Sequence, residues 1–361
     1  MRRIVLVVLA ALLGVAAGVA GLLGAAAITD RVPLFLLAGL AAFCLVYLLG
    51  LVLVTHGSEP SRRPRLCAVA FGAGTVMVVA AFTATAVLPL NDPRLPPMPV
   101  RGQHFLELPT GSRIAYVRLA AEGASLPTPV IVLHGGPGVP DLAGDASFFG
   151  RLTRDGFTVY VYDQVGRGRS SRLDDPHAYT LQRDVAALEA IRREIGAERM
   201  ILIGHSDGGV HAAAYAAANP EHVARIVLSS PGDPAPTAGG VSMVGRLSTE
   251  QKFGVYALLL QPRALLGSVL LQVNPQAAYN FAGDAEMDAR FDRVYNRTRP
   301  ALHCAGKPPG PQLHGLGFYA HYYPQSAASP RAPTSFPPWP SRPYRPWSSR
   351  GVATTSRGRR P

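Results

Sequence analysis

A serine flanked by glycines is the clearest candidate for chemistry in this chain. Ser206 stands in the run GHSDG at 204–208, which follows the apolar run Met200–Ile203 and precedes a segment with helical periodicity. Small residues around the serine permit a sharp strand-to-helix turn that lifts its hydroxyl above a sheet, at a helix N-terminus that favours negative charge. We therefore predict that Ser206 is a nucleophile; the alternative is an ordinary turn serine.

A second glycine-rich turn could stabilise the charge that such a nucleophile creates. The run HGGPG at 134–138 follows the apolar run Pro129–Leu133. Glycines let backbone N–H groups approach a substrate carbonyl closely, and two N–H groups aimed at the developing oxyanion lower the barrier. We predict that the N–H groups of Gly136 and Asp207 form this pair. The alternative is a plain turn between a strand and a helix.

Two further features near these motifs are predicted to be structural. The run DQVGRGRS at 163–170 follows the apolar run Thr158–Tyr162, and we expect it to pack beside the 134–138 turn without a catalytic role. His205 adjoins the nucleophile, but neighbouring side chains on a tight turn diverge, so we interpret it as a packing residue. Asp207 is expected to contribute its backbone rather than its carboxylate.

Short apolar runs alternate with helical segments around these motifs. Such alternation predicts an α/β fold in which helices cover both faces of a mostly parallel sheet, with ligands bound beyond the carboxyl ends of the strands. All three motifs fall at such ends. The predicted strands are Gln103–Leu108, Arg113–Leu119, Pro129–Leu133, Thr158–Tyr162, Met200–Ile203 and Val223–Leu228, and the predicted helices are Tyr179–Ile195 and Gly208–Ala218.

In this order and spacing, the three motifs resemble the prolyl iminopeptidase-like branch of the α/β-hydrolase fold, over residues 101–300. The resemblance implies that Ser206 is the nucleophile, that Gly136 and Asp207 supply the oxyanion donors, and that no cofactor is used. It implies cleavage of a small peptide, amide or ester through an acyl-enzyme. Peptidases of this branch usually carry a tryptophan directly after the nucleophile. This chain has Asp207 there, which leaves proline specificity open.

The segment after the last predicted strand differs from the core at 101–233. Residues 234–300 are expected to form a helical cap, with helices at Val241–Val273 and Ala282–Arg299. Three acids spaced four apart lie on one face of the second helix, and we expect that face to be solvated. These acids are Asp284, Asp288 and Asp292.

The partners that a serine nucleophile needs are not evident. In this fold the catalytic acid and then the histidine follow the nucleophile, after later strands. Asp292 is the last acidic residue, and no strand or acid accompanies His303, His314 or His321. We therefore assign no catalytic acid or base. Two hypotheses stay open: a serine hydrolase, inactive if its acid and histidine are lost, and a non-catalytic membrane-tethered binding protein with a degenerate hydrolase fold.

The last sixty residues have an unusual composition. Residues 301–361 hold 12 of the 33 prolines and no acidic residue, so we predict an irregular, disordered tail. A frameshift after about Tyr323 is a second hypothesis. Read one base out of frame across 343–359, permitted codons can encode an apolar strand followed by a turn with an acid, as the missing element requires.

Three apolar runs fill the first ninety residues, at Ile4–Thr29, Pro33–Val54 and Leu66–Leu90. Each is long enough to cross a bilayer as a helix, so we predict a three-helix transmembrane region at 1–90, joined by a proline-rich linker at 91–100. The alternative for the first run is a cleaved signal peptide. Arginines at 2, 3, 62, 63 and 65 place the N-terminus and the second loop in the cytoplasm, so the hydrolase domain is predicted outside the cell membrane.

Charge and cysteine content exclude other classes of protein. The net charge of +12 comes from the ends of the chain, with +4 in residues 1–100, +8 in residues 301–361 and none in between. A domain of balanced charge has no electrostatic footprint for nucleic acid. The three cysteines make no disulfide framework, and the spacing of potential ligands predicts no metal site or phosphate loop.

Overall fold

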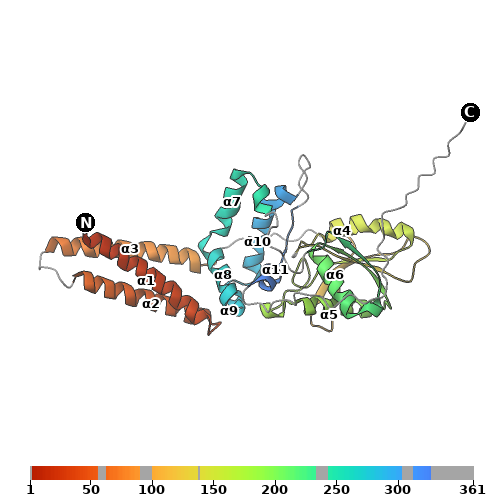
Figure 1. Cartoon of the computed structure of the whole chain (residues 1–361), viewed down its shortest axis with the longest axis horizontal. Coiled ribbons are helices and arrows are strands. Elements are labelled where there is room, and N and C mark those ends of the chain that lie inside the picture. Colours follow the sequence, from red (N-terminus) through yellow and green to blue (C-terminus); the bar gives the residue numbers. More distant parts are fainter. Residues whose placement is uncertain are drawn as a thin grey trace, which may run out of the picture.

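The computed structural model describes residues 2–55, 62–89, 100–136, 139–232, 243–302 and 312–326. Three N-terminal helices lie at one end of the long axis, an α/β sheet lies at the other, and a group of helices lies between them (Figure 1). The middle group is the cap.

The N-terminal helices are α1 (Arg2–Ala26), α2 (Val32–Thr55) and α3 (Arg62–Val87). Glycines let α1 and α2 pack backbone to backbone: a Cβ on Gly18 would lie 3.2 Å from the carbonyl oxygen of Gly39. Small residues of this kind are typical of helix pairs packed in a membrane.

Two helices are long and apolar enough to cross a membrane, over Val5–Ala26 and Val32–Val54. A third apolar stretch, Gly72–Val87 of α3, is shorter, so the described residues support two of the three predicted spans.

The sheet has six strands in the order β1-β2-β4-β3-β5-β6. The four strands β4, β3, β5 and β6 are parallel, whereas β2 pairs antiparallel with both β1 and β4, so the sheet is mixed. All six strands were predicted from the sequence. Their bounds are β1 Gln103–Glu107, β2 Arg113–Leu119, β3 Val130–Leu133, β4 Val159–Tyr162, β5 Met200–His205 and β6 Val223–Ser229.

Helices cover both faces of the sheet. On one face, α4 (Leu142–Phe149) packs on Val130 and Val132; on the other face lie α5 (Leu181–Glu194) and α6 (Asp207–Ala218) (Figure 1). Successive residues of a strand point to opposite faces, so the neighbours Ile131 and Leu133 join the core under α5 and α6.

The cap contains four helices between residues 249 and 298. The predicted helix Val241–Val273 is two helices, bent by 68° where Pro262 begins the second. Proline at the first position of a helix is favoured, because the missing N–H needs no partner there. The bounds are α7 Thr249–Leu259, α8 Pro262–Val273, α9 Pro275–Phe281 and α10 Asp284–Thr298.

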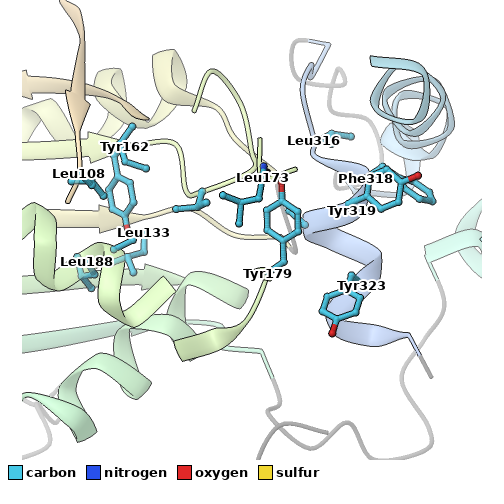
Figure 2. Packing of buried hydrophobic residues seen from close by; sticks show 14 of the residues in the cluster. Leu108, Leu133, Tyr162, Leu173, Tyr179, Leu188, Leu316, Phe318, Tyr319 and Tyr323 are labelled. Carbon is cyan, nitrogen blue, oxygen red and sulfur yellow. Dashed lines mark hydrogen bonds between the residues drawn. The ribbon is translucent and has the colours of Figure 1, made fainter. Parts of the chain in front are cut away.

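Part of the segment predicted to be a disordered tail belongs to the core. Residues 312–326 include α11 (Phe318–Tyr322), and Leu316, Tyr319 and Tyr323 are buried in the same hydrophobic cluster as the sheet. Figure 2 shows these side chains opposite Tyr179 of the core. The prediction of disorder rested on the proline content of the whole segment. It failed for residues 312–326 because their aromatic side chains are buried against an apolar surface that exists only in the folded chain. The hypothesis of a frameshift after about Tyr323 falls on residues that, from 327 onward, lie outside the described residues.

Candidate active site

The three motif loops meet at one edge of the sheet. The strands β4, β3 and β5 are parallel neighbours, and the loops that follow them begin at Asp163, His134 and Ser206 respectively. The carboxyl ends of parallel strands share one edge, as was expected from the sequence.

Ser206 occupies the strand-to-helix turn in a strained backbone conformation. It lies between β5 and α6 with φ 50° and ψ −117°, and its N–H donates to the carbonyl oxygen of Ser229 on the neighbouring strand. A positive φ is uncommon for a residue with a side chain, and such strain is found most often at functional sites. Its carbonyl oxygen accepts hydrogen bonds from the N–H groups of Gly209 and Gly232, which hold the turn in place.

Glycine is required beside this turn because α6 begins against another backbone segment. A Cβ on Gly208 would collide with the carbonyl oxygens of Leu133 and His134. A Cβ on Gly135 would come within 2.5 Å of the His205 ring. The first turn of α6 therefore lies directly against the 133–135 segment.

His134 shapes the turn that carries Gly136. It is buried, and its Nε2 accepts the N–H of Gln164 while the Gln164 side chain donates to the His134 carbonyl oxygen. Since Nε2 is an acceptor, Nδ1 carries the proton and donates to the Gly135 carbonyl oxygen at 2.9 Å. Burial lowers the pKa of His134 to about 3, so the ring is neutral. The 163–170 loop thus packs beside this turn, as predicted.

The two predicted oxyanion donors lie on adjoining segments. Gly136 ends the described part of the 134–138 turn, since residues 137 and 138 lie outside the described residues. Asp207 opens α6, where backbone N–H groups lack partners within the helix. The contact between Gly208 and the 133–134 backbone joins the two segments.

The carboxylate of Asp207 takes part in a buried network that sequence reasoning missed. Its Oδ2 lies 3.7 Å from Nε2 of His211 and 4.0 Å from the Arg167 guanidinium. Burial opposes ionisation of Asp207, but the charges of His211 and Arg167 outweigh it and lower its pKa. Arg167 also donates to the carbonyl oxygen of Ala320 in α11. The one available sequence signal for this network was the spacing of four residues between Asp207 and His211, which puts both side chains on the same face of a helix.

No hydrogen bond joins the Ser206 hydroxyl to another described residue. His303 lies outside the described residues, while His314 precedes α11 and His321 lies within it. His205, predicted to be a packing residue, is exposed, and its ring lies against Gly135. Nor do the described residues bring together a group of acids, histidines or cysteines that could hold a metal.

The prediction that the acids of the second cap helix face solvent is wrong for two of the three. Asp288 is 0% exposed and accepts hydrogen bonds from Arg172 and from the N–H of Phe318. Asp292 is 7% exposed and accepts the N–H groups of Gly315 and Leu316. Segment 312–326 packs on this face of α10, so the carboxylates bond to backbone instead of water.

Residues 128–293 match the family model for the alpha/beta hydrolase fold. The chain is 38% identical over 124 residues to a proline iminopeptidase of Heyndrickxia coagulans, covering 34% of this chain and 41% of that protein. It is 37% identical over 121 residues to a proline iminopeptidase of Lactobacillus helveticus, covering 32% of this chain and 39% of that protein. The chain thus spans about two fifths of the length of these curated relatives.

Among solved structures, a proline iminopeptidase of Mycobacterium smegmatis is 22% identical and covers 63% of this chain and 79% of its own, with a TM-score of 0.36. The family match and the curated relatives support an α/β-hydrolase fold.

Proposed function

We propose that this chain is a membrane-anchored serine hydrolase that cleaves a small peptide, amide or ester through an acyl-enzyme on Ser206. The observation that carries the proposal is the positive φ of Ser206 at the β5–α6 turn, against the glycine-rich 134–136 segment. A strained serine at this place in the fold exposes its hydroxyl at the edge of the sheet where substrates bind.

The proposed reaction begins when the Ser206 oxygen bonds to the substrate carbonyl carbon. Negative charge moves to the carbonyl oxygen, where the N–H groups of Gly136 and Asp207 stabilise it. The bond to the leaving amine or alcohol then breaks, and the leaving group takes the serine proton. Water cleaves the resulting ester and restores the hydroxyl. The start of α6 favours the transient negative charge.

The substrate class follows from the relatives. Curated relatives are called proline iminopeptidases, so a small peptide or amide is the first choice. In place of the tryptophan usual in this branch, the chain has Asp207, whose carboxylate pairs with His211 and Arg167. Screening of dipeptide amides and short esters would therefore include residues other than proline at the N-terminus.

Labelling with a fluorophosphonate tests the nucleophile directly. We expect the folded, full-length protein in membranes to be modified stoichiometrically at Ser206, and a Ser206→Ala variant to remain unlabelled. Peptide mass mapping locates the adduct. Labelling at another serine, or equal labelling of both proteins, contradicts the assignment.

A second candidate function is a non-catalytic binding protein that is tethered to the membrane. The observation in its favour is that the Ser206 hydroxyl has no histidine partner among the described residues. A serine without a base is a poor nucleophile. Folded protein that binds dipeptide amides yet stays unlabelled by the fluorophosphonate would favour this function.

The proposed explanation for the missing acid and base is a frameshift after about Tyr323. The nucleotide sequence decides this point. We expect the alternative frame to be open, to encode an apolar strand and a turn with an acid across 343–359, and to encode the catalytic histidine as well. A stop codon in that frame ends the hypothesis.

We further propose that α1, α2 and α3 all cross the cell membrane. Arg263 binds the carbonyl oxygen of Val87 at the end of α3, and Asn274 binds that of Ala26 at the end of α1. Both helices thus end at the cap. With the N-terminus in the cytoplasm, the hydrolase domain would lie outside.

An impermeant thiol reagent on intact cells tests this orientation. We expect labelling of an Arg154→Cys variant in the hydrolase domain and none of a Ser58→Cys variant between α2 and α3, in a background without native cysteines. The reverse pattern would place the domain inside.

A further inference from the structure

One face of α7 exposes large apolar side chains. Phe253, Tyr256 and Leu260 are 76%, 50% and 65% exposed, and their spacing of three and then four residues puts them on one side of the helix. Val255, on the opposite side, is buried. A helix face in water normally carries charged or polar residues, so this face is unusual for a surface in contact with solvent.

The other side of the same bent helix pair is also apolar. Leu258 of α7, together with Ala264 and Leu271 of α8, lines a cavity of about 250 Å³ whose far wall includes Met287 and Phe291 of α10. A helix that is apolar on both sides is ordinarily buried. Part of α7 is therefore built for contact with something apolar besides the cap.

Hydrogen bonds fix α8 across the end of the N-terminal helices. Arg263, in the first turn of α8, donates to the carbonyl oxygen of Val87 at the end of α3, and its remaining nitrogens bind Glu286 of α10. Asn274, just after α8, donates to the carbonyl oxygen of Ala26 at the end of α1. The two ends of α8 are thus bonded to the ends of two N-terminal helices.

The attachment of α8 to the ends of α1 and α3 places α7 beside the end of the N-terminal helices. It leads into α8 through the 68° bend, and it runs across the direction of α1–α3 in Figure 1. Ile28 and Leu88, at the same end of the helical bundle, are also exposed. Exposed apolar side chains therefore occur at the ends of α1 and α3 as well as on α7.

We propose that the exposed face of α7 lies on the surface of the lipid bilayer. The proposal rests on α1 and α2 spanning that bilayer, which is part of the proposed function. Helices with Phe, Leu and Tyr on one face bind at the boundary between headgroups and acyl chains, about 5–10 Å deep. The cap is then held against the membrane through α7 as well as through α8.

Fluorescence quenching by brominated lipids tests the proposal in the full-length protein. Single cysteines carrying an environment-sensitive dye are placed at Phe253, at Leu45 in the middle of α2 and at Arg154 near α4, with the native cysteines replaced by alanine. All three positions are exposed, so the label does not disturb packing. The protein is reconstituted in phosphatidylcholine vesicles brominated near the headgroup or near the chain ends.

We expect the dye at 253 to lose most of its fluorescence with bromine near the headgroup, the dye at 45 to lose it with bromine near the chain ends, and the dye at 154 to lose none. Quenching at 45 without quenching at 253 overturns the proposal. Excimer formation between dyes at 253 in two chains would assign this face to a second copy and also overturn it. Absence of quenching at 45 refutes the membrane anchor and the proposal together, whereas fluorophosphonate labelling of Ser206 is independent of all three results.

Discussion

The guanidinium of Arg172 lies 2.8 Å from the Asp288 carboxylate, in a pair that is almost fully buried. Arg172 follows the 163–170 loop of the sheet, and Asp288 lies on α10 of the cap. Arg172 also donates to the carbonyl oxygens of Gly168 and Gly315. One side chain therefore connects the core, the cap and the C-terminal segment.

We expect loss of this pair to be costly. Replacing one partner of a buried pair leaves an uncompensated charge, so Asp288→Ala should lower the free energy of unfolding by about 3–5 kcal/mol. Thermal or chemical unfolding of the purified protein measures the change. The control is Arg113→Met, which removes the exposed pair with Glu107 and should cost about 0–1 kcal/mol. Equal losses in the two variants would contradict a connecting role for Arg172.

The backbone strain at Ser206 gives a second expectation. Strain at such a backbone conformation costs about 1–3 kcal/mol, whereas glycine adds about 0.5–1 kcal/mol of unfolded-state entropy, so Ser206→Gly should raise the free energy of unfolding by up to about 2 kcal/mol while abolishing fluorophosphonate labelling. Ser229→Gly, in the extended strand β6, should instead lower it by about 0.5–1 kcal/mol. A Ser206→Gly protein less stable than the parent would show that the turn is unstrained.

Two glycines in helices should respond oppositely to alanine. In Gly208→Ala the new methyl group meets the carbonyl oxygens of Leu133 and His134, backbone atoms that cannot move aside, so we expect a loss of about 1–3 kcal/mol. In Gly254→Ala, on α7, the nearest atom is 3.8 Å from the new Cβ, so better helix propensity should raise stability by about 0.5–1 kcal/mol. Both values come from unfolding curves. The same sign in both variants would count against close packing of α6 on the 133–134 segment.

The neutral state of His134 predicts a pH dependence. Its pKa is about 3 in the folded protein because of burial, against about 6.5 in an unfolded chain, which therefore takes up the proton first on acidification. The contribution of neutral His134 to the free energy of unfolding is complete above pH 6.5. It is lost as the pH falls towards 3, at up to about 1.4 kcal/mol per pH unit.

Comparison with His134→Gln isolates this effect. Asp163, whose pKa burial raises to about 6, changes stability in the opposite direction between its ordinary value of 3.8 and about 6, so the parent alone shows a mixed result. The difference in free energy of unfolding between the parent and His134→Gln should become smaller as the pH falls below 6.5. A constant difference would mean that His134 is not buried in its neutral form.

The sequence alone determined the elements whose signals are local. Short apolar runs located β3, β4, β5 and β6, and glycines marked the turns after β3 and β5. Parallel neighbours then place the three motif loops at one edge. These predictions held because strand formation and tight turns depend mainly on nearby residues.

Only the tertiary structure decided which faces and charges are buried. Helical periodicity put Asp288 and Asp292 on one face of α10, but the packing of 312–326 turned that face inward. The pairing of Asp207 with Arg167 likewise joins α6 to the 163–170 loop, which sequence spacing leaves apart. Burial and charge pairing depend on residues distant in the chain, so no local pattern could have predicted them.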